Sequence, residues 1–471
     1  VEYFSQIFLS FIASWGYVAV AVLMAAENAC IPIPSELILG FALPMLLGTL
    51  FQQFYSMVDT IIVGRMLGRD ALAGVGSTGA INFMINGFVI GVCSGFAIPV
   101  AQRFGAQDYH GLRRYNGNII WLSLIFSAVM TLWIALLTRP ILCWMNTPED
   151  IFLYAYRYIF IIFLGIPTTF LYNITASVIR SLGDSKTPVY FLIFAALLNI
   201  VLDYVSIAFL GFGVDGPAYA TVLSQGLSGL ICLLYMIRHF PILRFEEGEL
   251  RISRKRCGTL LRMGIPMGLQ YSITAIGSVI LQTAVNGLGA VAVASITAGQ
   301  RISNFFCCVF DTLGATMATY SGQNVGALKF DRVREGVLEA TKLGSIYAIL
   351  ICLLSIFFGG QLPKIFLDAG EREVIANAHF YLVANTVFYI PLVLVNVFRF
   401  SLQGMGFSGL AVLAGVAEMA ARSLVAFLFV PFFGYAAVCF ASPLAWICAD
   451  AFLVPPFFKS LRSLKIRSGM A

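Results

Sequence analysis

Residues 51–68 read FQQFYSMVDTIIVGRMLG and place a single carboxylate, Asp59, inside a long apolar stretch. An ionised carboxylate in hydrocarbon costs roughly 2.5 to 3.5 kcal/mol on insertion scales, so Asp59 is expected to face protein or a water-filled cavity. Ser56, Tyr55 and Gln52 precede it by three, four and seven residues. In a helix these spacings put the four side chains on one face, which predicts that this face lines a cavity. The alternative is a buried Asp that only ties two helices together.

The composition is that of a polytopic membrane protein. Of the 471 residues, 59% are hydrophobic and 11% are charged, and the mean hydropathy is +0.89. Soluble domains carry about 25% charged residues. A helix needs about 20 apolar residues to cross a bilayer, and the sequence predicts an all-α protein with twelve such helices. The predicted spans are 36–64, 71–101, 115–137, 152–179, 188–211, 215–238, 258–287, 292–323, 337–359, 375–403, 409–432 and 436–459.

The basic residues are distributed unevenly among the loops, and this asymmetry predicts the orientation of the chain in the membrane. If the first of the twelve helices runs outward, 20 of the 29 Lys and Arg residues, Arg180 among them, fall in the inner loops and the C-terminal tail, and five fall in the outer loops. The positive-inside rule then places the C-terminus in the cytoplasm, and we expect the chain in the plasma membrane. This topology accounts for the net charge of +6, so no nucleic-acid partner is expected.

No motif for enzymatic or ATP-driven chemistry stands out. The ten cysteines contain no C-x-x-C pair, the three histidines show no zinc-ligand spacing, and there is no P-loop signature. We therefore expect neither an enzyme nor a cofactor.

Short runs of sequence recur at a nearly constant offset, which predicts an internal repeat. Three runs recur at offsets of 221 to 223 residues: 43–45 as 265–267, 101–106 as 322–327, and 180–185 as 403–408. Six spans per repeat is an even number, so the two halves enter the membrane in the same sense, as in parallel-repeat transporters. The predicted domains are an N-lobe at 41–240, a cytoplasmic linker at 241–257 and a C-lobe at 258–471.

The acids of the two halves differ. Asn199 and Asp203 stand at i and i+4 on one face of the fifth helix. In the second half Asp203 is matched by Ala426, and Asp59 is matched by Leu281. The first half thus holds two intramembrane carboxylates that the second lacks.

Asp59, Asn199, Asp203 and the hydroxyl of Thr221 would form an oxygen-rich cluster if their helices converge. Sodium takes oxygen ligands, and neighbouring buried carboxylates favour a proton, so the cluster predicts a cation site for either ion. The alternative is a structural hydrogen bond between an Asp and an Asn.

The second half has its own intramembrane charges. Glu418 and Arg422 stand at i and i+4 and predict a structural ion pair. Asp311 and Asp450 are expected either to pair with Arg399 or to line the cavity.

Residues 1–42 contain no Lys or Arg, and therefore lack the positive region of a secretory signal. Their pattern, which ends in ENACIPIPSE, resembles the opening segment of the DedA membrane-protein family. The resemblance implies that Glu27 belongs to a re-entrant proton site; the other interpretation is that residues 1–40 are an added hydrophobic segment.

The rest of the chain, about 41–465, resembles the multidrug and toxic compound extrusion (MATE) transporters. The most specific runs are ALPMLLGTLFQQFYSMVDTIIVGRMLG at 41–67, VAQRFGAQD at 100–108, SVIRSLGDSKTP at 177–188 and LLNIVLDY at 197–204. The resemblance implies two six-helix bundles around a V-shaped cavity, which faces each side of the membrane in turn and exchanges a cation for a drug.

The resemblance also assigns roles to single residues. Asp59 matches the first-helix acid of the family, and Asn199 with Asp203 matches its N-x-x-x-D pair. Thr221 falls where the family's N-lobe cation site takes a hydroxyl, and Pro44 matches the proline at which the first helix bends. The branch that resembles NorM has a glutamate in the seventh helix where this chain has Thr274. The chain therefore looks more like the DinF branch.

The function predicted from the sequence is secondary antiport. We expect a monomer that exports amphipathic, cationic organic compounds in exchange for protons or sodium, with Gln52, Tyr55 and Asn173 lining the substrate cavity. A lipid-linked oligosaccharide flippase of the same superfamily is the first alternative, although its cavity should be basic. The other is a non-transporting scaffold or DedA-like lipid scramblase.

Overall fold

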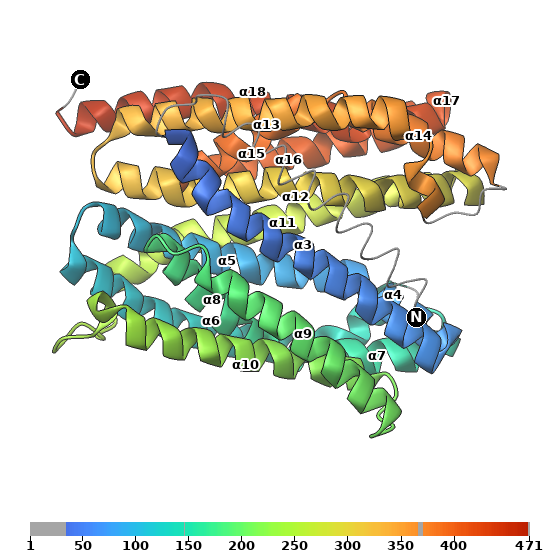
Figure 1. Cartoon of the computed structure of the whole chain (residues 1–471), viewed down its shortest axis with the longest axis horizontal. Coiled ribbons are helices and arrows are strands. Elements are labelled where there is room, and N and C mark those ends of the chain that lie inside the picture. Colours follow the sequence, from blue (N-terminus) through green and yellow to red (C-terminus); the bar gives the residue numbers. More distant parts are fainter. Residues whose placement is uncertain (1–33, 146, 366–370, 470–471) are drawn as a thin grey trace.

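The computed structural model describes residues 34–145, 147–365 and 371–469, and every regular element in these ranges is a helix (Figure 1). The N-terminal half contains α3 (Pro34–Leu67), α4 (Arg69–Ser77), α5 (Gly79–Gly105), α6 (Tyr109–Trp144), α7 (Glu149–Leu164), α8 (Ile166–Ser181), α9 (Thr187–Ala208), α10 (Asp215–His239) and the 3₁₀ turn η2 (Pro241–Leu243). The C-terminal half contains α11 (Arg254–Asn286), α12 (Ala290–Gly326), α13 (Phe330–Phe358), η3 (Leu362–Ile365), α14 (Arg372–Thr386), α15 (Tyr389–Gly404), α16 (Ser408–Leu424), the π turn η4 (Val425–Phe429), α17 (Val430–Phe433) and α18 (Tyr435–Arg467).

Nine spans among the described residues are long and apolar enough to cross a membrane, or eleven if each of two bent helix pairs is one span. The chain is thus an all-helical, multi-pass membrane protein. All twelve predicted segments fall on helices. The predicted span 292–323 lies in α12 but is not among these candidates, because polar side chains such as Gln300, Arg301 and Asn304 interrupt its apolar run.

Two predicted spans are bent rather than straight. α7 and α8 meet at 46°, and α14 and α15 meet at 50°. The first break is at Gly165, and Pro167 follows it in the first turn of α8, where a missing N–H costs nothing. The two breaks occupy equivalent places in the two halves, as a structural repeat requires.

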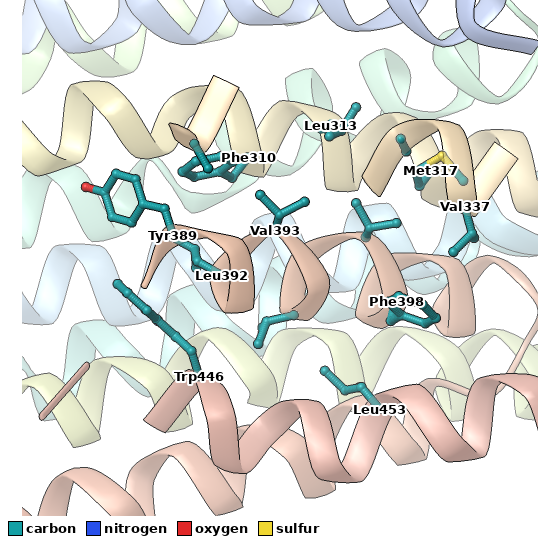
Figure 2. Packing of buried hydrophobic residues seen from close by; sticks show 14 of the residues in the cluster. Phe310, Leu313, Met317, Val337, Tyr389, Leu392, Val393, Phe398, Trp446 and Leu453 are labelled. Atoms are coloured by element: carbon teal, nitrogen blue, oxygen red, sulfur yellow. The ribbon is translucent and has the colours of Figure 1, made fainter. Parts of the chain in front are cut away.

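Each half has its own apolar core, and one helix crosses between them. The core of the C-terminal half gathers Phe310, Tyr389, Phe398 and Leu453 from α12, α15 and α18 (Figure 2). Ile38, near the start of α3, also belongs to this core. α3 packs first on α12 and α13 and then on α9 and α4, so it runs obliquely from one half to the other (Figure 1).

The two halves meet most tightly where α5 and α12 end. A Cβ atom on Gly105 would lie 1.9 Å from the carbonyl oxygen of Gln323, and one on Gly326 would lie 1.8 Å from that of Gln102. Only glycine fits at either position, because no side-chain atom can approach a backbone oxygen so closely. We call this pair of contacts the glycine crossing.

The two glutamines of the crossing also bond to the opposite half. Gln102 Nε2 donates to the carbonyl oxygen of Gly404 at 2.9 Å, and Gln323 Nε2 donates to that of Ser181 at 3.0 Å. The recurring runs 101–106 and 322–327 therefore form one reciprocal contact between the halves.

The linker between the halves is held on α6. Glu249 is buried and accepts bonds from Arg113 Nε and the Glu246 amide at 2.7 and 2.8 Å, and it pairs with His110 Nδ1 at 2.7 Å. His110, Glu246 and Glu249 lie close enough together to hold a metal, an arrangement that the sequence spacing did not predict. However, Arg113 bonds both carboxylates, so this cluster is an ion-pair network.

Candidate cation site and substrate cavity

A cavity of about 690 Å³ lies within the N-terminal half and is closed on one side by the other half. Most of its wall comes from α3, α5, α8, α9 and α10. The C-terminal half supplies Met267 and Tyr271 from α11, Ala315, Ala318 and Thr319 from α12, and Phe400 from α15. The cavity wall thus contains residues of both halves, so the shape of the cavity depends on how the two halves are arranged.

The two predicted carboxylates meet at the edge of this cavity. Asp59 lines it, Asp203 is fully buried, and the two carboxyl groups are neighbours. Asp59 Oδ1 and both carboxyl oxygens of Asp203 have no hydrogen-bond partner among the described residues. Two neighbouring unpaired carboxylates repel each other, so the arrangement favours a bound cation or a shared proton.

Asn199 and Thr221 stand beside this pair and line the same cavity. Asn199 Nδ2 donates to Thr221 Oγ1 at 3.3 Å, and Asn199 Oδ1 is buried without a partner in the described part of the chain. The structure therefore brings together all four residues of the predicted cluster. They offer carboxyl, amide and hydroxyl oxygens, the ligands that sodium prefers.

The three residues predicted to line the cavity are all found in its wall. Tyr55 lies near both acids. Asn173 Nδ2 donates to the carbonyl oxygen of Thr169 at 2.8 Å. Pro44 lies inside α3, near its N-terminal end.

Sequence reasoning missed several residues of the cavity. Tyr158 of α7 is buried beside Asp59 and Asp203, and Thr169 Oγ1 donates to Gln225 Oε1 at 2.8 Å. Arg180, assigned above to an inner loop, instead lies in α8 and lines the cavity. Each is polar within an apolar helix, which is the signal that identified Asp59.

The acids of the C-terminal half are arranged differently. Glu418 forms an ion pair with Arg399 and lies 3.7 Å from Arg422 Nη2. All three side chains are buried. The predicted pair of Glu418 and Arg422 is therefore present, but Glu418 contacts a second arginine as well. Asp311 and Asp450 form no ion pair within the described ranges.

Comparisons with known proteins show the family of the chain. The MatE family model matches residues 44–205 and again residues 266–428, starting 222 residues apart. The chain is similar to two proteins of Bacillus subtilis strain 168 that are named probable multidrug resistance proteins. It is 31% identical to YpnP over 364 residues (76% of this chain and 79% of that protein) and 29% identical to YoeA over 357 residues (74% and 77%).

A solved structure has the same fold. It is described as the outward-facing conformation of a multidrug resistance MATE family transporter of the MOP superfamily, and matches with a TM-score of 0.85 at 22% identity over 92% of this chain and 97% of that one. The double family match confirms the internal repeat, and we call residues 44–205 and 266–428 the first and second repeats. The chain belongs to the MatE family, and it is therefore a membrane transporter rather than an enzyme.

Proposed function

We propose that the chain is a secondary antiporter of the DinF-like branch, which exports amphipathic, cationic organic compounds in exchange for protons or sodium ions. The names of its Bacillus relatives support multidrug export. The branch assignment is supported by α11, which contains no Asp or Glu and has Thr274 where a NorM-like glutamate would stand.

One observation carries the proposal: the neighbouring Asp59 and Asp203 carboxyl groups, with oxygens that have no partner among the described residues, lie at the wall of a cavity large enough for an organic molecule. If the two carboxyl groups had a purely structural role, hydrogen-bond donors or basic side chains would face them, because burying an unpaired charge costs free energy. In this chain their remaining oxygens are free for an ion. Asn199 and Thr221 complete the coordination.

Coupling follows if the ion and the drug exclude each other. A cation at the cluster neutralises the two acids and removes the attraction for a cationic drug in the adjoining cavity. Each ligand then shifts the population toward the state that it binds better. Pro44 is the hinge: it deprives α3 of one backbone hydrogen bond, and α3 contacts both halves.

The proposed architecture has twelve spans in two parallel lobes, 41–240 and 258–471, joined by the linker 241–257 around a V-shaped cavity in the plasma membrane. The matching bends of α7–α8 and α14–α15 support it. The linker and the C-terminus lie at the same end of the molecule, and we assign that end to the cytoplasm (Figure 1). The protein works as a monomer. Residues 1–33, with Glu27 and most of the DedA-like segment, lie outside the described residues.

The test is ethidium efflux in everted membrane vesicles, with proton and sodium gradients imposed separately. We expect the wild type to pump under one gradient, and Asp59→Asn and Asp203→Asn to fall to the level of empty vesicles. Asp150→Asn, a change of an exposed acid at the start of α7, is the matched control and should pump normally. Normal pumping by both cluster variants would contradict the proposal and direct attention to Asp311 and Asp450.

A further inference from the structure

A basic surface pocket of about 300 Å³ lies where the chain turns from α12 into α13, beside the last turn of α18. This turn is at the same end of the molecule as the C-terminus, the end that we assign to the cytoplasm (Figure 1). Lys465 Nζ pairs with Asp331 Oδ1 at 2.5 Å, whereas Lys329 and Arg332 form no ion pair among the described residues. The pocket therefore has two positive charges without a carboxylate partner. It is lined by Leu328, Lys329, Phe330, Asp331, Arg332 and Lys465.

The first half contains the same backbone turn, between α5 and α6. Leu328 and Gln107, which stand 221 residues apart, both have a positive φ, of 59° and 56°. The amides of the next residues, Lys329 and Asp108, both bond to the carbonyl oxygen five residues earlier, at 2.8 and 3.0 Å. Lys329 is therefore the structural equivalent of Asp108, and each of them precedes the first residue of a long helix.

In the first half this turn holds a carboxylate, and in the second half it does not. The Asp108 carboxylate accepts a hydrogen bond from the Gly111 amide at 2.8 Å and pairs with Arg103 Nη1 at 2.8 Å. Lys329 makes no such bond to α13, and Gly111 is matched by Arg332. The first amides of a helix attract an anion because they have no partner within the helix. The second half thus has basic side chains around a position that an Asp carboxylate fills in the first half.

The pocket lies at the level of the lipid headgroups. α13 has 29 residues and is therefore about 43 Å long, which matches the roughly 40 to 45 Å of a bilayer with its headgroups. Two exposed apolar side chains adjoin the basic groups: Leu328 lines the pocket, and Ile466 follows Lys465 on α18. A phospholipid presents a phosphate and an apolar part together, whereas a free anion in solution does not.

We propose that this pocket binds the headgroup phosphate of an anionic phospholipid in the leaflet at this end of the molecule. Lys329 and Arg332 donate charge-assisted hydrogen bonds to the phosphate, at the place equivalent to that of the Asp108 carboxylate. Asp331, which would repel the phosphate, is neutralised by Lys465. Basic pockets on the cytoplasmic side of membrane proteins bind such headgroups. The site is separate from the cavity of the N-terminal half and does not depend on which compounds are transported.

The test compares two lipids with identical acyl chains, phosphatidylglycerol and phosphatidylethanolamine, by native mass spectrometry of the purified, detergent-solubilised protein. The wild type should bind phosphatidylglycerol at least about fivefold more tightly. Lys329→Asp installs the residue of the first repeat, whose carboxylate should cap α13 and take the place of the phosphate. In this variant the two lipids should bind about equally, and the melting temperature should not fall, because Asp is a favourable N-cap residue.

The matched control is the double variant Arg238→Gln/Lys255→Gln, which makes the same change in net charge. Both residues are exposed near the linker, at the same end of the molecule, and the control should keep the wild-type ratio of affinities. An unchanged ratio in Lys329→Asp, an equal loss in the control, or a wild type without preference for phosphatidylglycerol would overturn the proposal. Displacement of phosphatidylglycerol by millimolar inorganic phosphate would identify a site for free anions and would overturn the assignment to a lipid.

Discussion

The two halves of this transporter share a framework but differ in whether their buried acids have arginine partners. In the N-terminal half, Asp59 and Asp203 are neighbours at a cavity, and neither forms an ion pair with a basic residue in the described part of the chain. In the C-terminal half, Glu418 is buried between Arg399 and Arg422. An acid that is already paired has nothing left for a ligand. This difference is the basis of our proposal that the N-terminal half binds the ion, whereas Glu418 stabilises the C-terminal half.

The framework itself is kept in both repeats. Gly105 is matched by Gly326 and Gln102 by Gln323, and each pair makes the same contact with the opposite half. The two carboxylates at the cavity are not kept, since Asp59 is matched by Leu281 and Asp203 by Ala426. The lesson of the comparison is that repeated residues build the contact between the halves, whereas the acid pair is found in the first half only.

Removing the paired acid should cause the largest loss of stability. Glu418→Gln leaves two buried arginines without a carboxylate, which costs about 3 to 5 kcal/mol by analogy with other broken buried pairs. We expect a large fall in the melting temperature of the detergent-solubilised protein. Asp203→Asn removes a carboxylate that forms no ion pair among the described residues, so this variant should not lower the melting temperature. If both variants lost stability equally, the contrast between the halves would be wrong.

The glycine crossing tests the symmetric part of the comparison. Gly105→Ala and Gly326→Ala each place a methyl group under 2 Å from a backbone oxygen, and forcing such helices apart costs about 1 to 3 kcal/mol. The two variants should lower the melting temperature by similar amounts. Gly409→Ala, with no atom within 4 Å of the added methyl group, is the control. If only one of the two alanine variants had a lower melting temperature, the two contacts of the glycine crossing would not be equivalent.

The linker acid should give the smallest effect. Burial alone would raise the pKa of Glu249, but its bonds to Arg113, the Glu246 amide and His110 outweigh burial and hold that pKa below its ordinary value. The stabilisation is therefore fully present above the ordinary pKa of a glutamate and is lost as the pH falls through the lowered value. Glu249→Gln should cost about 1 kcal/mol at neutral pH and nothing in strong acid. Melting curves of both proteins across pH check this, and a difference that persists in strong acid would argue against the ion pair.

The sequence predicted the helices and the residues that come together at the candidate site, because both depend on local signals. Apolar runs marked the spans, and polar residues inside them marked Asp59, Asn199, Asp203 and Thr221. The bends and the oblique path of α3 depend on which helices pack together, and hydropathy carries no such information. Arg399 was not assigned to Glu418, because the two stand on different helices. Arg180 was assigned to a loop, because a basic residue at a helix end looks the same whether it faces water or a cavity.

The most direct test of the central claim is ethidium binding to the purified protein as proton and sodium concentrations are varied. If Asp59 and Asp203 hold the coupling ion, that ion should weaken ethidium binding to the wild type, and the weakening should be absent in Asp203→Asn. The same ion dependence in both proteins would contradict the claim that the N-terminal acid pair couples the two ligands.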